Sequence, residues 1–140
     1  GTYIAYSQYQ QSQRFFEAPM AASARWHVAA TAEEFKQLLA QAPKGQKIII
    51  DVYADWCVAC QPIEHRILKS AMVQQALAPY YLIKLDLSHY DATHQVLLNQ
   101  WDILGPPTYL FLDASQQEIR GLRLTGAFTE AELLAQLQRF

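Results

Sequence analysis

The fold is decided by the stretch Ile48-Ile49-Ile50-Asp51-Val52-Tyr53-Ala54-Asp55-Trp56-Cys57-Val58-Ala59-Cys60, which contains both cysteines of the chain. Residues 47–54 are an apolar, β-branched run of the kind found in strands that are buried on both faces. Ile63 and Ile67 follow at helical spacing. We therefore expect the two cysteines at the end of a central strand, where a helix begins.

Two cysteines at this spacing can close a small disulfide ring. The unpaired N–H groups at the start of a helix lower the cost of a thiolate on the first sulfur. In disulfide exchange one thiolate attacks a disulfide sulfur, and a second thiol resolves the mixed disulfide. We predict Cys57 as the nucleophile and Cys60, shielded one turn into the helix, as the resolving thiol. The alternative is a pair of inert buried cysteines that share this position by chance.

The composition indicates one domain with an ordinary core. The chain has 140 residues, of which 51% are hydrophobic and 17% charged, and this suits a single domain. Its net charge of -2 comes with scattered basic residues, so nucleic acid is not an expected partner. A lone cysteine pair this close in sequence cross-links almost nothing, which disfavours a purely structural disulfide. We expect a monomer that needs no cofactor.

The first 25 residues differ from the rest. Their aromatic residues lie among Gln and Ser, and such a mixture occurs at membrane interfaces, so residues 1–9 are compatible with the edge of a membrane segment. The alternative is a loosely packed leader. No apolar run reaches the roughly 18 residues that span a bilayer. We expect residues 1–25 to be a partly disordered leader or tether and residues 26–140 to be the folded domain.

The remaining segments alternate between strand and helix patterns. Thr31 with Glu34 and Thr129 with Glu132 are capping boxes, which predict helix starts. Pro62 must lie in the first turn of its helix or kink it. The expected elements are a strand at 26–28, a helix after Thr31, the central strand, a broken helix from 60 to 77, a strand at 80–87, a helix at 92–101 with Val96 and Leu97 inward, strands at 108–112 and 118–124, and a last helix after Thr129.

The order of these elements predicts how the strands pair. Alternating strands and helices favour parallel pairing through right-handed crossovers. The short turn at 113–116 predicts instead that the last two strands form an antiparallel hairpin. The expected class is α/β, with a central mixed sheet flanked by helices.

This arrangement resembles the thioredoxin family. Three places carry the resemblance: Trp56-Cys57-Val58-Ala59-Cys60 as the active-site motif, Asp51 six residues before the first cysteine, and Gly105-Pro106-Pro107-Thr108 as the proline loop. Within that family, residues 53–60 with Glu64 are most similar to the C-terminal periplasmic domains of the DsbD transmembrane thiol-disulfide reductases. The resemblance implies a thioredoxin-like fold with Cys-x-x-Cys at the N-terminus of a helix, and a thiol-disulfide reductase.

The resemblance also implies partners and a location. Electrons would arrive from a membrane-embedded cysteine pair and leave, through transient mixed disulfides, to an amino-terminal periplasmic domain of the same protein. The chain would then be a soluble periplasmic domain of a membrane-anchored bacterial protein. A free-standing thioredoxin-like reductase is the alternative.

Two acids are candidates for tuning the cysteines. Asp51 is expected beneath them on the strand, and Glu64 on the same helix face as Cys60. A carboxylate held away from water tends to stay protonated, and its ionised form disfavours a nearby thiolate. The acids would keep Cys57 less acidic, which favours an electron donor, and would shuttle the proton of Cys60. The alternatives are a solvent-facing Glu64 and a merely structural Asp51.

A docking site for partners is expected beside Cys57. Trp56 would shield the cysteines and offer a flat surface, with core packing as its alternative role. By resemblance, Pro107 is cis and faces the cysteines before Thr108, so that an extended partner segment pairs with the backbone there. Pro106 lacks an N–H, so a partner would form one hydrogen bond fewer at that position. The alternative is an ordinary rigid turn.

A zinc-binding module is the alternative from another class. Cys57, Cys60, His89 and His94 have the right ligand types, with C-x2-C and H-x4-H spacings. The two halves are far apart in sequence, however, and in the expected fold both histidines face water. We therefore expect no metal.

Overall fold

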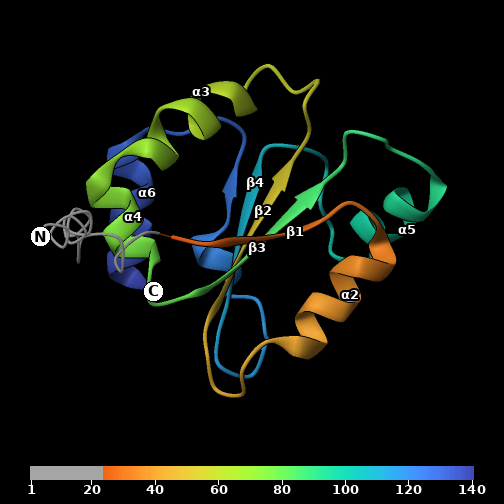
Figure 1. The fold of residues 1–140 in the computed structure, drawn as a ribbon, viewed down its shortest axis with the longest axis horizontal. Helices are drawn as coiled ribbons and strands as arrows, with labels where there is room; N and C mark the ends of the chain where they lie inside the picture. The colour runs from red at the N-terminus through yellow and green to blue at the C-terminus, as the bar shows by residue number, and fades with distance from the viewer. Residues whose placement is uncertain (1–23) are drawn as a thin grey trace, which may run out of the picture.

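The structure is a computed structural model that describes residues 24–140, and it contains a five-stranded sheet in the order β1-β3-β2-β4-β5 (Figure 1). The strand β2 (Ile48–Tyr53) pairs in parallel with β3 (Tyr81–Asp86), which pairs in parallel with β1 (Trp26–Ala29). On its other side β2 pairs antiparallel with β4 (Thr108–Leu112), and β4 with the short β5 (Leu124–Thr125). The predicted mixed sheet is therefore confirmed.

Helices cover both faces of this sheet (Figure 1). The helices α2 (Ala32–Gln41) and α5 (Ala92–Gln100) pack on one face, where Ile48 and Ile50 point. The helices α3 (Cys60–His65), α4 (Ala71–Leu77) and α6 (Glu130–Arg139) pack on the other face, together with two 3-10 turns, η2 (Ile67–Lys69) and η3 (Arg120–Leu122). Because β2 is covered on both faces and paired with a strand on each side, the loop that follows it begins at the centre of the sheet.

The predicted leader, residues 1–25, lies outside the described residues except for Ala24 and Arg25. From residue 24 onward, every helix is too short or too polar to cross a bilayer.

The segment after the cysteines is a broken helix, as predicted. Pro62 is the third residue of α3, where its missing N–H costs no helical hydrogen bond. The chain then passes through η2, and Ser70 restarts the helix by accepting a hydrogen bond from the Val73 N–H at 3.4 Å. The position of Pro62 is thus compatible with a helix that begins directly at Cys60.

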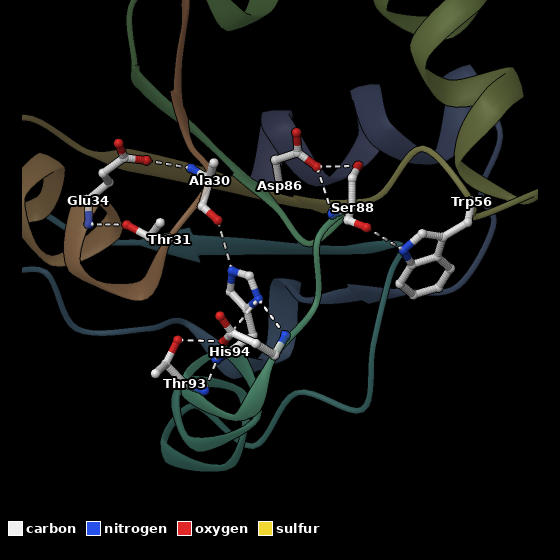
Figure 2. A network of polar contacts seen from close by, with 9 residues as sticks. Ala30, Thr31, Glu34, Trp56, Asp86, Ser88, Thr93 and His94 are labelled. Carbon is white, nitrogen blue, oxygen red and sulfur yellow. Dashed lines mark hydrogen bonds and ion pairs between the residues drawn. The ribbon is translucent and has the colours of Figure 1, made fainter.

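The two predicted capping boxes differ in detail. At α6, Thr129 and Glu132 bond reciprocally, as predicted. At α2, the Thr31 hydroxyl accepts from the Glu34 N–H at 3.0 Å, but the Glu34 carboxylate accepts from the N–H of Ala30 rather than from that of Thr31 (Figure 2). The glutamate thus ties the helix to the end of β1.

The helix α5 turns a different face inward than predicted. Val96 is 56% exposed, whereas Leu97 and Leu98 are buried. His94 is buried with them, because residues 94, 97 and 98 follow the spacing of one helix face. The expectation that Val96 points inward was wrong.

The expected strand at 118–124 is mostly absent. Only Glu118 bridges to Leu112, the chain turns through η3, and pairing with β4 resumes at Leu124. The turn allows Leu122 to bury its side chain in the core. It also places the Arg123 guanidinium on the Glu118 carboxylate, at 2.6 Å. Side-chain packing and this ion pair therefore replace ladder hydrogen bonds.

His94 was expected to face water, but it is buried and has two polar partners (Figure 2). Its Nε2 donates to the Ala30 carbonyl at 2.9 Å, and its Nδ1 accepts from the Asp91 N–H at 3.1 Å. A carbonyl can only accept and a backbone N–H can only donate, so the two partners place the ring hydrogen on Nε2 and use Nδ1 as an acceptor. The imidazole joins α5 to the end of β1.

Replacing His94 by alanine should lower the free energy of unfolding by about 3 kcal/mol, because a buried carbonyl and a buried N–H both lose their partner. Denaturant unfolding of the oxidised chain measures the change. Gln95→Ala is the control on the same helix, since this side chain is exposed and should change stability by less than about 0.5 kcal/mol. Equal losses in the two variants would contradict the structural role of His94.

Candidate redox site

The two cysteines form a disulfide between the loop that follows β2 and the first residue of α3. Their Cα atoms are 5.3 Å apart. The N–H of Cys57 donates to the Ala54 carbonyl and the N–H of Cys60 to the Cys57 carbonyl, each at 3.1 Å, so tight turns fix both residues. Cys57 is 7% exposed and Cys60 is 2% exposed. The more exposed sulfur-bearing residue is thus the predicted nucleophile, whose role stays a prediction.

A polar network anchors the loop before the cysteines to the end of β3 (Figure 2). The Ser88 hydroxyl accepts from the Asp55 N–H at 2.8 Å, and the Ser88 carbonyl accepts from the indole N–H of Trp56 at 3.2 Å. Asp86 in turn accepts from the Ser88 N–H at 2.9 Å. Neither Asp86 nor Ser88 was predicted as a site residue. Their signal was their position, because parallel neighbours β2 and β3 end at the same edge of the sheet.

Hydrogen bonds from Gln61 and Tyr53 also hold this loop. The Gln61 side-chain amide donates to the Asp55 carbonyl at 3.1 Å and to the Cys57 carbonyl at 3.3 Å. The Tyr53 hydroxyl donates to the Asp55 carboxylate at 2.6 Å. That hydrogen bond, with a smaller contribution from burial, raises the pKa of Tyr53 to about 12. The phenol therefore stays protonated and keeps donating.

Asp51 lies within β2 and is 2% exposed. Across the sheet it faces Lys84 of β3 and Tyr109 of β4. Burial raises the pKa of the Asp51 carboxyl well above its usual range, the negative charge of Glu64 raises it further, and the Lys84 ammonium opposes the shift. Asp51 thus has the environment of an acid that holds its proton.

Glu64 lies on α3 and forms an ion pair with Lys84. Its side chain is 13% exposed, so the structure does not have the solvent-facing glutamate of the alternative interpretation. The two predicted acids are brought together, so that the charge of Glu64 adds to the effect of burial on the pKa of Asp51. Lys84 was missed, although a lysine inside an apolar strand run signals a buried partner. Tyr109 was not predicted as a site residue either.

The surface beside Cys57 is apolar. Trp56 is 56% exposed, Val58 is 84% exposed and Leu104 is 93% exposed. The Trp56 side chain thus does not pack in the core. A hollow of about 220 Å³ next to it is lined by Trp56, Leu87, Tyr90, Leu98, Leu104, Gly105 and Pro106.

The proline loop forms one wall of this hollow. The peptide bond between Pro106 and Pro107 is cis, as predicted. Thr108 is buried and its hydroxyl donates to the Gly105 carbonyl at 2.6 Å. Trp56 and Pro106, far apart in sequence, therefore border one hollow, whereas Pro107 and Thr108 are buried and do not line it.

The proposed zinc ligands are not brought together. Cys57 and Cys60 are joined to each other, His89 is exposed, and His94 is buried against Ala30. Within residues 24–140, no group of three or more His, Cys, Asp or Glu side chains is placed to hold a metal ion.

Comparison with known proteins identifies relatives of this site. Residues 27–139 match the family described as Thioredoxin. The thiol:disulfide interchange protein DsbD of Yersinia pestis is 39% identical over 105 residues, which cover 75% of this chain and 18% of that protein. DsbD of Escherichia coli is 41% identical over 102 residues, which cover 73% of this chain and 18% of that protein. The chain thus spans under a fifth of the length of these relatives.

Solved structures share the fold. The C-terminal domain of Neisseria meningitidis DsbD in the oxidised form has a TM-score of 0.67 at 20% identity, covering 81% of this chain and 98% of that domain. A thioredoxin from Thermus thermophilus has a TM-score of 0.63 at 23% identity, covering 84% of this chain and 86% of that protein. The predicted resemblance to both groups is confirmed.

Proposed function

We propose that this chain, which belongs to the thioredoxin family and is a thiol-disulfide oxidoreductase, works chiefly as a reductant that passes electrons to a disulfide in another protein domain. The observation that carries the proposal is the Cys57–Cys60 disulfide at the start of α3, the helix that holds the half-buried Glu64, one short loop after the strand that holds the buried Asp51.

The reaction runs through two exchanges. The Cys57 thiolate attacks one sulfur of the partner's disulfide, a mixed disulfide forms, and the partner's other sulfur leaves as a thiolate. Cys60 then gives its proton to Asp51 and attacks the sulfur of Cys57, which expels the second partner sulfur. The Cys57–Cys60 disulfide has formed, two electrons have moved to the partner, and the partner's two thiolates take up protons.

The buried acids support the electron-donor direction. A cysteine pair is a strong oxidant when its reduced form is stabilised, for example when the thiolate of its first cysteine is strongly favoured. Here Asp51 and Glu64 place carboxyl groups near the start of α3, and the intervening Val58 and Ala59 bring no positive charge. The reduced form gains little from its thiolate, so it gives up electrons readily.

The partners follow from the likeness to DsbD. The donor would be a membrane-embedded cysteine pair, and the acceptor an amino-terminal periplasmic domain of the same longer protein, with residues 1–25 as the tether to residues 26–140. The location would be the periplasm. The apolar hollow between Trp56 and Pro106 supports docking, because an extended segment flanking the partner's cysteine can bury its side chains there.

Equilibration of the chain with glutathione buffers tests the direction of electron flow. We expect a reduction potential near the reducing end of the roughly -270 to -120 mV range that thioredoxin-like proteins span. A value near the oxidising end would contradict the donor role.

Trapping tests the partner. The Cys60→Ser variant is incubated with the oxidised amino-terminal domain of a DsbD. It should form a one-to-one mixed disulfide that dithiothreitol releases, because the resolving thiol is missing. Non-reducing electrophoresis and intact mass measure it, and Cys57→Ser is the control that should form none. If the variant reacts with a small disulfide reagent but not with this domain, the partner assignment fails and a free-standing reductase is the better description.

A further inference from the structure

Three polar side chains form a row across the sheet below the redox site. Asp51 on β2 pairs in register with Lys84 on β3 and with Tyr109 on β4. Residues directly opposite each other on neighbouring strands point their side chains to the same face. Glu64 of α3 joins this row through its ion pair with Lys84. The Asp51 carboxyl therefore lies between a cation that is already paired and a phenol.

The phenol of Tyr109 has no structural need for its hydroxyl. Its ring is 0% exposed and packs edge-on against Phe128, at 5.0 Å between ring centroids, and against Trp26, at 6.2 Å. A phenylalanine would make the same contacts. The hydroxyl is instead a polar group in an apolar cluster, where it costs free energy unless it finds a partner.

Three oxygens of this cluster lack a partner in the disulfide form. Over residues 24–140, the buried side-chain atoms without a hydrogen bond are Asp51 Oδ2, Glu64 Oε2 and Tyr109 Oη. Buried polar atoms are nearly always paired in folded proteins. That all three unpaired atoms belong to adjoining residues points to a hydrogen bond that forms in another protonation state of the cluster.

We propose that Tyr109 is a positioning residue for proton transfer: its hydroxyl donates a hydrogen bond to the Asp51 carboxylate once this is ionised, and so holds it as the base that takes the proton of Cys60. The inference rests on the proposed function, since it concerns the step in which Cys60 resolves the mixed disulfide.

The groups around Asp51 explain why a neutral donor is needed. Glu64 is negative and disfavours an ionised Asp51, whereas Lys84 favours it but is engaged with Glu64. Tyr109 remains as the donor that carries no charge of its own. Burial, together with the charges of Asp51 and Glu64, raises the pKa of the Tyr109 phenol well above its usual range, so the phenol donates its hydrogen without losing it.

The proton balance is simple. The Cys60 thiol gives its proton to the Asp51 carboxylate as the sulfur attacks Cys57, and Tyr109 keeps its own proton throughout. Asp51 gives this proton to solvent before the resolving step of the next cycle. Without the phenol, the carboxylate is harder to ionise, and a smaller fraction of molecules holds a base ready at neutral pH.

The test uses the reduced full chain and 5,5′-dithiobis(2-nitrobenzoate), a coloured disulfide reagent. Cys57 releases the first thionitrobenzoate, and Cys60 releases the second when it resolves the mixed disulfide. In Tyr109→Phe, loss of a hydrogen bond to a charged group should raise the pKa of Asp51 and slow the second release about tenfold at pH 7, without slowing the first. Carbon-13 NMR titration of the Asp51 carboxyl measures the pKa directly.

Two controls separate positioning from packing. Tyr81→Phe removes a hydroxyl from the neighbouring strand β3, where the ring stacks on His27, and should leave both releases unchanged. In an Asp51→Asn background, Tyr109→Phe should have no further effect on the second release. A tenfold loss in that background too, or an unchanged Asp51 pKa in Tyr109→Phe, would overturn the proposal. If the original chain releases only one thionitrobenzoate, the proposed function itself fails.

Discussion

Changing Cys57 to serine should reduce disulfide exchange to the uncatalysed background. A serine hydroxyl does not ionise at neutral pH, and the remaining Cys60 is 2% exposed, so no accessible thiolate is left to attack a partner's disulfide. The rate at which the reduced chain consumes 5,5′-dithiobis(2-nitrobenzoate) measures the loss. This is the largest effect that a single substitution should have on activity.

The matched control is Cys60→Ser. This variant keeps the nucleophile and should release one thionitrobenzoate, with the reagent's other half remaining on Cys57 as a stable mixed disulfide that intact mass detects. If Cys57→Ser instead reacts as fast as the original chain, Cys60 is the attacking sulfur and the assignment of the two roles is reversed.

Changing Asp51 to asparagine should make the oxidised chain lose less stability between acid and neutral pH than the original chain loses. A raised pKa means that the folded chain holds this proton more tightly than the unfolded chain, whose value is near 3.8. Between these two pKa values the folded chain binds more protons, so its free energy of unfolding falls as pH rises, by about 1.4 kcal/mol per pH unit. The variant lacks this titration. Its free energy of unfolding should therefore rise relative to that of the original chain by the same amount per pH unit.

Denaturant unfolding of the two oxidised chains from pH 4 upward measures the difference. The gain should level off once the pH passes the folded pKa of Asp51, because both states are then ionised. Glu33→Gln removes an exposed carboxyl on α2 and should show no comparable slope. A difference between Asp51→Asn and the original chain that does not change with pH would contradict the raised pKa.

Local sequence determined the elements around the redox site. The apolar run 47–54 is a strand because its residues are β-branched and suit burial on both faces, and Pro62 fits only the first turn of the helix after it. The capping box at Thr129 likewise set a helix start. These features depend on residues a few positions apart, and so the cysteine pair at the strand-helix junction was predictable.

Packing overruled local pattern elsewhere. Residues 118–124 alternate like a strand, yet the chain turns at η3 because Leu122 gains more by entering the core and Arg123 finds Glu118. Val96 is apolar but lies on the outer face of α5, since the buried face is fixed by where α2 and the sheet lie. A pattern of residue types does not contain those positions.

The sequence by itself determined the identity of the redox pair, the strand that leads into it, and the nearby acids Asp51 and Glu64. Only the tertiary structure decided what surrounds those acids: Lys84 and Tyr109 come from two other strands and meet Asp51 through sheet register. It also decided that Ser88 anchors the loop before Cys57. The physical reason is that hydrogen bonds and charge pairing act over a few ångströms in space, whereas these partners are 20 or more residues apart along the chain.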